Sequence, residues 1–289
     1  MAEYHHPEYL ISSADLETDL ADQTVRVFDA TVFLVPAETG YRPESGRAKY
    51  ADGHVPGSAF MDLIETFADT STGLGFSLPS AEKLQDGFRS IGINNDSRIV
   101  FYSTGHMMWA TRAWWLAYYA GLRNIAVLNG GFRGWKSEAR DIDTGESTYP
   151  QGDVTVLANA DCFVDKNDVQ SAMEDPQTCT VNALAPETYA GTGDIHYGRR
   201  GHIPGSLNLF YNDLMHEGEF RPADQLRKAL DRHGMLNADR VVTYCGGGIS
   251  ATIDAFACLL VGQADVAVYD GSMSEWVREG LPLVEGDNP

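Results

Sequence analysis

The chain repeats itself once, and this repeat constrains its fold more than any other feature. Three segments return in the second half in the same order: GHVPGS at 53–58 as GHIPGS at 201–206, RIVFYS at 98–103 as RVVTYC at 240–245, and GGFRGW at 130–135 as GSMSEW at 271–276. Matches that keep one order and nearly one offset indicate a duplicated domain rather than a solenoid of short repeats. Domains average roughly 150 residues, so we expect one domain over 1–150 and a second over 151–289.

Each copy alternates short apolar runs with helical patterns. The predicted strands are 25–29, 98–102, 125–128, 178–181, 241–244 and 266–269, and the predicted helices are 80–91, 107–120, 222–233, 250–261 and 272–279. Strands that alternate with helices favour parallel sheets with helices on both faces. The fold class is therefore α/β, with two similar domains of this kind. The spacing also places about six extra residues in the first copy, and the polar stretch 69–75 is the expected insertion, as a surface loop.

Charge and cysteine content exclude several classes of function. The chain has 21 Lys and Arg against 41 Asp and Glu, a net charge of −20. Such a surface repels phosphate backbones, so we expect neither nucleic acid nor an anionic membrane as a partner. No run approaches the ~20 apolar residues of a membrane span, and the first ten residues do not resemble a secretory signal. Four cysteines in 289 residues do not form a disulfide scaffold, which favours a reducing cytoplasm.

The most informative site candidate is Cys245, at the end of a predicted strand. Three glycines, Gly246, Gly247 and Gly248, follow it, and then Ile249 and Ser250 open an apolar helix. Ligands of open parallel sheets bind at this edge. Glycines let successive N–H groups curl around the sulfur, and the helix dipole adds positive potential, so both favour the thiolate form. We expect Gly247 to need a positive φ. The alternative is a buried strand cysteine followed by a tight turn.

The first copy has Ser103 at the cysteine position, with no base beside it. One competent loop and one degenerate loop indicate a catalytic second domain joined to an inactive first domain. Three other uses of the loop fit the sequence poorly. A cysteine phosphatase needs an arginine at the position of Ala251, a phosphate-binding loop needs a lysine, and thioredoxin-like chemistry needs a second cysteine where Gly248 stands.

The chain resembles the tandem-domain rhodanese family, the thiosulfate and 3-mercaptopyruvate sulfurtransferases. The resemblance spans nearly the whole chain and rests on both GH(V/I)PGS motifs, on LPSAE at 78–82, RAWW at 112–115 and GGFRGW at 130–135, and on the loop 245–250. It implies two rhodanese-like domains with an inactive first one. It also implies a cycle in which a cysteine thiolate takes sulfur from a donor, becomes a persulfide and passes the sulfur to a thiophilic acceptor. A six-residue loop matches the sulfurtransferase pattern rather than that of the family's phosphatase relatives.

Departures from the family pattern leave the donor open between thiosulfate and 3-mercaptopyruvate. The loop lacks the basic residues of thiosulfate-preferring members, and Gly247 replaces the serine of mercaptopyruvate-preferring ones. Phe76 stands where such members carry a histidine, and Leu184 stands where the family carries a clamping arginine. Arg199 and Arg200 are then the best remaining cations for an anionic donor, with solvated loop charges as the alternative.

The sequence therefore predicts a sulfurtransferase of EC 2.8.1 type. Cys245 is the expected nucleophile, and the expected substrate-binding residues are Gly246, Gly247, Gly248, Ile249, Ser250, Arg199 and Arg200. No metal and no cofactor are expected, and the expected acceptor is a thiol or cyanide, with thioredoxin as one candidate. A non-enzymatic persulfide carrier or rhodanese-type interaction module is the alternative.

Other conspicuous residues have structural interpretations. One histidine in each copy of the repeated motif, His54 and His202, indicates a turn rather than a ligand set. Cys162, Cys179 and Cys258 lack a glycine cradle and metal-ligand spacing. Tryptophans on apolar helix faces are core candidates: Trp114, Trp115, Trp135 and Trp276. The segment 107–109 is a candidate for either a pocket wall facing Cys245 or simple packing at the domain junction.

Overall fold

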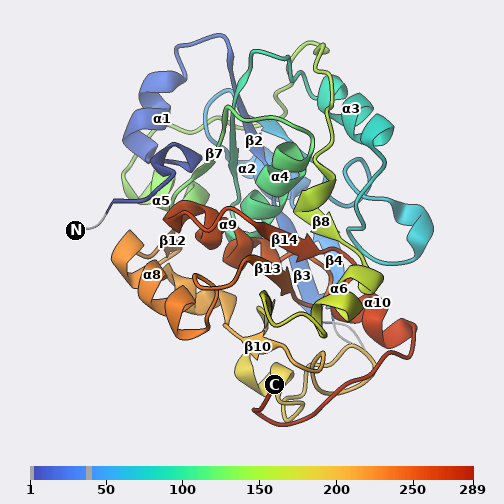
Figure 1. Cartoon of the computed structure of the whole chain (residues 1–289). Helices are drawn as coiled ribbons and strands as arrows, with labels where there is room; N and C mark the ends of the chain where they lie inside the picture. Colours follow the sequence, from blue (N-terminus) through green and yellow to red (C-terminus); the bar gives the residue numbers. More distant parts are fainter. Residues whose placement is uncertain (1–2, 37–40) are drawn as a thin grey trace.

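The computed structural model describes residues 3–36 and 41–289, which form two α/β halves built on one plan (Figure 1). The first half contains a parallel sheet in the order β1-β7-β6-β2-β5. Its strands are β1 (Leu10–Ile11), β2 (Val25–Asp29), β5 (Ala59–Phe60), β6 (Arg98–Tyr102) and β7 (Ile125–Leu128). Its helices are α1 (Ser13–Asp19), α2 (Arg47–Asp52), α3 (Ala81–Ser90), α4 (Met108–Tyr119) and α5 (Gly131–Ser137).

The second half contains a parallel sheet in the order β10-β9-β13-β14-β8. Its strands are β8 (Phe163–Val164), β9 (Thr178–Asn182), β10 (Leu207–Asn208), β13 (Arg240–Tyr244) and β14 (Val266–Tyr269). Its helices are α6 (Lys166–Ala172), α7 (Pro186–Tyr189), α8 (Ala223–Arg232), α9 (Ala251–Val261) and α10 (Ser272–Arg278). Two antiparallel hairpins lie outside these sheets: β3 (Val32–Pro36) with β4 (Tyr41–Ser45), and β11 (Met215–His216) with β12 (Glu219–Phe220).

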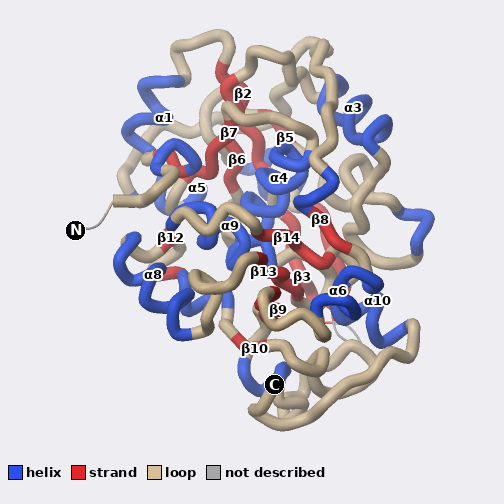
Figure 2. Tube along the Cα trace, in the orientation of Figure 1, coloured by secondary structure: helices blue, strands red, loops and turns tan. Residues whose placement is uncertain are grey.

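The predicted fold class is confirmed, because helices cover both faces of each parallel sheet (Figure 2). Val27 and Val100 of the first sheet pack on one face with Trp135, whereas Phe28 and Phe101 face a larger core. In the second sheet, Val242 packs on its outer face, and Val241 joins the same larger core as Phe28. Alternation along a strand sends successive side chains to opposite faces, so each sheet separates an outer core from a core that both domains share.

Helices α4 and α9 form the centre of the shared core. Every residue of α9 is buried, and α4 is buried from Trp109 to Ala117. A helix that is buried all round must be enclosed by other elements, and here each helix is enclosed by its own sheet and by the other helix. Thr111 of α4 and Thr252 of α9 meet in a hydrogen bond of 2.7 Å between hydroxyl oxygens. The two domains therefore behave as one packed body.

The repeated GH(V/I)PGS motif is a structural turn in both domains, as predicted. His54 and His202 are fully buried, and each stacks on a tyrosine, with ring centroids 4.1 Å and 3.6 Å apart. Each Nδ1 lies 2.9–3.0 Å from that tyrosine's carbonyl oxygen. These contacts fix each turn with its histidine buried and stacked, which is a structural role.

Most predicted elements coincide with the structure to within one or two residues. The helix expected at 80–91 is α3, and its Ser80 cap accepts a hydrogen bond from the Lys83 N–H at 3.2 Å. The expected insertion 69–75 is a surface segment with a 3-10 turn at Thr70–Thr72, and Arg278 of the second domain donates to the Thr72 carbonyl. The predicted core tryptophans are all buried. No described helix is long and apolar enough to cross a bilayer.

Candidate active site

Cys245 lies at the carboxyl end of β13, in the loop that leads into α9. Its side chain is 2% exposed. The loop 245–250 lies between the C-terminal ends of the strands and the N-terminus of a fully buried helix. This is the edge at which open parallel sheets bind ligands, so the structure places the predicted nucleophile where the topology favours chemistry.

The start of α10 holds the loop in position. The Ser272 hydroxyl accepts hydrogen bonds from the Cys245 N–H at 3.0 Å and the Gly248 N–H at 3.1 Å, and it donates to the Tyr269 carbonyl at 2.7 Å. Ser274 donates its N–H (2.9 Å) and its hydroxyl (2.7 Å) to the Gly246 carbonyl. Ser272 and Ser274 were missed by the sequence analysis, although they belong to the repeated segment 271–276.

Ser272 has a left-handed backbone, with φ of +49°. Gly131 stands at the equivalent place in the first domain, with φ of +56°. A non-glycine residue in this region stores strain of order 1–3 kcal/mol and persists where surrounding contacts enforce it. Here the three hydrogen bonds of the Ser272 hydroxyl are those contacts, and glycine could not supply them.

Two of the three glycines of the loop are required, each for a different reason. Gly248 has φ of +72°, and a Cβ there would lie 2.5 Å from the Asp270 carbonyl oxygen. A Cβ at Gly246 would lie 2.0 Å from the Tyr197 hydroxyl. The expectation that Gly247 needs a positive φ is wrong. Its φ is not in that region, and its nearest neighbour would be 3.9 Å away. The residue with the positive φ is Gly248, one position later than expected, and the Ser272 hydroxyl accepts a hydrogen bond from its N–H.

Four N–H groups of the loop are free to bind an anion. Those of Gly246, Gly247, Ile249 and Ser250 donate to no protein acceptor among the described residues. Oriented backbone N–H groups at the start of a helix stabilise negative charge. The loop can therefore stabilise a thiolate, a persulfide or a bound anion at Cys245.

Three titratable side chains that sequence analysis missed surround Cys245. Burial and then the negative charge of a Cys245 thiolate raise the pKa of Tyr197, Tyr211 and Asp254. Asp254 is completely buried on α9, and neither of its oxygens has a hydrogen-bond partner in the described chain. In all three groups the raised pKa favours the neutral form. Tyr197 gave no sequence signal because it lies in an irregular segment, 190–201.

Arg199 and Arg200 line a pocket to which no residue of the loop 245–250 contributes. Arg199 donates to the Leu281 carbonyl at 2.8 Å, and Arg200 donates to the carbonyls of Gly191 (3.1 Å) and Gly193. Both are exposed and line a shallow pocket together with His196 and Glu285. Their role toward a donor stays a prediction.

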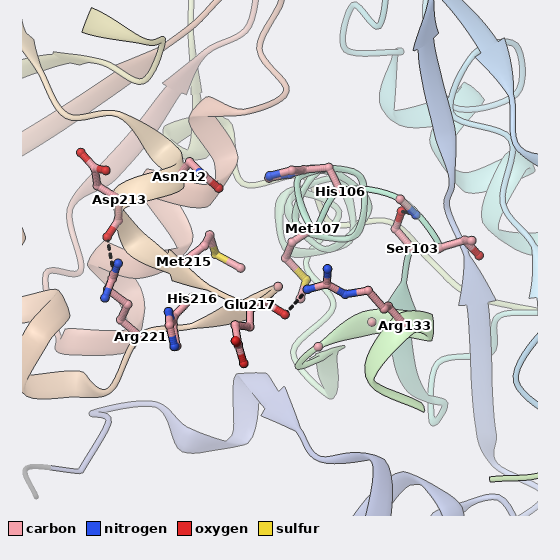
Figure 3. Close-up of a pocket in the computed structure, with 15 residues that line it drawn as sticks. Ser103, His106, Met107, Arg133, Asn212, Asp213, Met215, His216, Glu217 and Arg221 are labelled. Carbon is pink, nitrogen blue, oxygen red and sulfur yellow. Dashed lines mark hydrogen bonds between the residues drawn. The ribbon is translucent and has the colours of Figure 1, made fainter. Parts of the chain in front are cut away.

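In the first domain, the segment 103–107 corresponds to the start of the Cys245 loop. It faces a pocket of about 640 Å³ (Figure 3). The pocket is lined by 103–107 from the first domain and by parts of 212–221 from the second. Met107 lines it, whereas no residue of the loop 245–250 does. Met108 and Trp109 do not line this pocket, and Trp109 packs in the shared core instead.

Ser103 has no base beside it, as the sequence indicated. Its hydroxyl oxygen accepts from the Gly105 N–H at 3.0 Å and lies 3.3 Å from the Thr31 hydroxyl. The imidazole of His106 points toward Asn212 and away from Ser103 (Figure 3). A serine hydroxyl without a general base is a weak nucleophile, so this pocket lacks the chemistry available at Cys245.

The other cysteines are structural in character, as predicted. All four cysteines of the chain, Cys245 included, are free thiols. Burial raises the pKa of Cys162 and of Cys179 to about 11, and it raises the pKa of Cys258 well above its ordinary value. Protonated buried thiols are unreactive. The described residues contain no cluster of three or more His, Cys, Asp or Glu that could hold a metal.

Comparisons with known proteins agree with this geometry. The family model for the rhodanese-like domain matches residues 12–138 and again 165–279. The 3-mercaptopyruvate sulfurtransferase of Escherichia coli K12 is 29% identical, over 93% of this chain and 95% of its own length. The thiosulfate sulfurtransferase of Cricetulus griseus is 33% identical, over 89% and 86%.

Among solved structures, the 3-mercaptopyruvate sulfotransferase SseA of Escherichia coli superposes with a TM-score of 0.81 at 27% identity, over 91% of this chain and 98% of that one. Its described fold is the rhodanese fold. With both of its domains matched by one family model, the chain belongs to the rhodanese-like domain family.

Proposed function

We propose that this protein is a sulfurtransferase that moves sulfane sulfur from a small anionic donor to a thiophilic acceptor through a persulfide on Cys245. The observation that carries the proposal is the set of four free N–H groups, those of Gly246, Gly247, Ile249 and Ser250, in the loop after Cys245. Support also comes from relatives at about 30% identity that are 3-mercaptopyruvate and thiosulfate sulfurtransferases.

The proposed reaction has two half-cycles at one sulfur atom. The Cys245 thiolate attacks the donor's transferable sulfur, a new S–S bond forms, and the donor's S–S or C–S bond breaks. When thiosulfate is the donor, the leaving group is sulfite. When 3-mercaptopyruvate is the donor, the leaving group is the enolate of pyruvate, which takes up a proton to give pyruvate. The acceptor then attacks the outer sulfur, and the electron pair of the S–S bond returns to Cys245.

The loop N–H groups stabilise negative charge in both half-cycles. We expect these N–H groups to point at the reacting sulfur. Backbone donors held by the fold need no reorganisation as charge develops, so they lower the barrier. Removing one such donor in other enzymes costs about 10²–10³ in kcat. The raised pKa of Tyr197, Tyr211 and Asp254 favours their neutral forms, which add no like charge beside the thiolate.

3-Mercaptopyruvate is the donor we favour over thiosulfate. The loop offers backbone N–H groups and no Lys or Arg side chain to a dianion. Arg199 and Arg200 already bind backbone carbonyls. Steady-state comparison of the two donors with a common acceptor tests this choice. A higher kcat/KM for thiosulfate would overturn it.

A persulfide carrier without rapid turnover is the second candidate. It is favoured by Leu184, which occupies the place of the family's clamping arginine. Turnover of a small donor with cyanide or thioredoxin as acceptor decides between the two. A single stoichiometric loading of Cys245, without multiple turnovers on either acceptor, would favour the carrier.

A further inference from the structure

Arg112 is a buried cation of the first domain that reaches the loop of Cys245 in the second. It lies on α4 and is 1% exposed. One guanidinium arm donates to the Gly248 carbonyl at 3.1 Å. The other donates to the Asp270 carboxylate at 2.8 Å and to the Phe76 carbonyl. A planar guanidinium can hold several acceptors at fixed angles, which a lysine ammonium cannot do.

Gly248 is consequently held through both of the peptide units that meet at its Cα. Its N–H donates to Ser272, and its carbonyl accepts from Arg112. No described peptide bond is cis, so the carbonyl of Gly248 and the N–H of Ile249 point in opposite directions. The carbonyl points at the guanidinium, and the Ile249 N–H therefore points to the other side of the loop. Arg112 thus sets the direction of one of the four free donors.

The repeat shows that a simpler contact would be enough to join the domains. In the second domain, the Asp270 carboxylate accepts from the Leu78 N–H of the first domain at 2.7 Å. At the equivalent place in the first domain, the Asn129 amide oxygen accepts from the Phe220 N–H of the second domain at 3.0 Å. The same contact across the junction is thus made twice, once with a charge and once without.

Within residues 3–36 and 41–289, an ion pair crosses the junction only on the side that carries the cysteine. Arg112 pairs with Asp270 beside the loop of Cys245. The residue that matches Arg112 in the repeat is Asp254 on α9, and its carboxyl has no hydrogen-bond partner among the described residues. A buried ion pair is weak as a source of stability because both charges lose water. The position of the Arg112–Asp270 ion pair, on the Cys245 side of the junction, is better explained by a contribution to the geometry of the loop.

We propose that Arg112 is a positioning residue for the Cys245 loop, through which the inactive first domain fixes the orientation of the Gly248–Ile249 peptide. The proposal rests on the proposed function only for its consequence in sulfur transfer. Its direct consequence is the reactivity of the Cys245 sulfur, which can be measured without any sulfur donor.

The experiment compares Arg112→Met with a matched variant on the other side of the junction, Asn129→Ala. The second-order rate of Cys245 alkylation by iodoacetamide is measured from pH 5 to 10 in the full chain, with the site identified by peptide mass spectrometry. Urea unfolding reports stability for each variant. We expect Arg112→Met to slow alkylation at pH 7 by tenfold or more and to move the midpoint of the pH profile upward. We expect Asn129→Ala to lose stability while its alkylation rate stays within twofold of wild type.

Arg112→Lys keeps the positive charge but has one ammonium in place of the two guanidinium arms. It is the variant to measure if Arg112→Met does not fold. A more than twofold slower alkylation in this variant supports the proposal. An Arg112→Met protein, or failing that an Arg112→Lys protein, that folds and alkylates within twofold of wild type overturns it. So does an equal slowing in Asn129→Ala, because the effect would then come from loosening of the junction. Failure of the proposed function is a separate result, in which the wild-type protein transfers no sulfur yet still alkylates at Cys245.

Discussion

Replacing Gly248 with alanine tests whether the loop geometry, rather than the presence of a cysteine, makes the site. The left-handed backbone costs an L-residue about 1–2 kcal/mol. The new Cβ would also lie 2.5 Å from the Asp270 carbonyl oxygen, a backbone atom at the end of β14 that has little freedom to move. Overpacking of this kind typically costs about 1–3 kcal/mol. We therefore expect Gly248→Ala to lower the free energy of unfolding by about 2–5 kcal/mol.

The matched variant is Gly247→Ala, one residue earlier in the same loop. Its Cβ would meet no atom closer than 3.9 Å, and its φ is not in the left-handed region. We expect its stability to stay within about 1 kcal/mol of wild type, because a compatible Gly→Ala change mainly restricts the unfolded chain.

Urea unfolding and Cys245 alkylation by iodoacetamide measure both variants. In Gly248→Ala the loop must shift to relieve the contact, and a displacement near 1 Å can cost about 10²-fold in reactivity at a site. Equal stability and equal alkylation rates for the two alanine variants would refute this reasoning. A larger loss in Gly247→Ala would refute it as well.

Three further predictions concern charge and the remaining thiols. Folded Asp254 keeps a proton that the unfolded chain loses above its ordinary pKa near 3.9, so stability should fall with rising pH by about 1.4 kcal/mol per unit until the raised folded pKa is reached. Asp254→Asn should remove that slope in urea unfolding measured from pH 5 to 8, and an unchanged slope would contradict the assignment. Arg199→Ala and Arg200→Ala should raise the donor KM if either binds the donor, with kcat preserved. A change below about twofold (~0.4 kcal/mol) in the double variant would show that they are solvated loop charges. Cys258→Ser should retain transfer, since Cys258 is a protonated core thiol, and loss of activity in a folded variant would show otherwise.

The repeat allowed much of the fold to be predicted. The predicted strands 98–102, 125–128 and 266–269 have the same bounds as β6, β7 and β14. These runs are easy to recognise because strands of a buried parallel sheet are almost continuously apolar. The two-residue edge strands and the hairpins β3–β4 and β11–β12 were missed. Their residues lack a long periodic pattern, and pairing with distant segments defines them.

The site was predicted less completely, for a similar reason. Cys245 and its glycines are contiguous, and their order alone indicates a turn at the end of a strand. The partners that fix this loop come from three distant segments: Ser272 from α10, Arg112 from the first domain, and Tyr197 from an irregular stretch. Which glycine takes the positive φ depends on Ser272, so sequence order could not distinguish Gly247 from Gly248.

The most direct test of the central claim is intact-protein and peptide mass spectrometry after brief exposure to 3-mercaptopyruvate or thiosulfate without an acceptor. We predict that the protein gains the mass of one sulfur atom, that the gain maps to the peptide containing Cys245, and that cyanide removes it. Cys245→Ser should show no gain while it keeps the wild-type unfolding curve. A sulfur adduct on another cysteine, or donor turnover that persists in Cys245→Ser, would contradict the account.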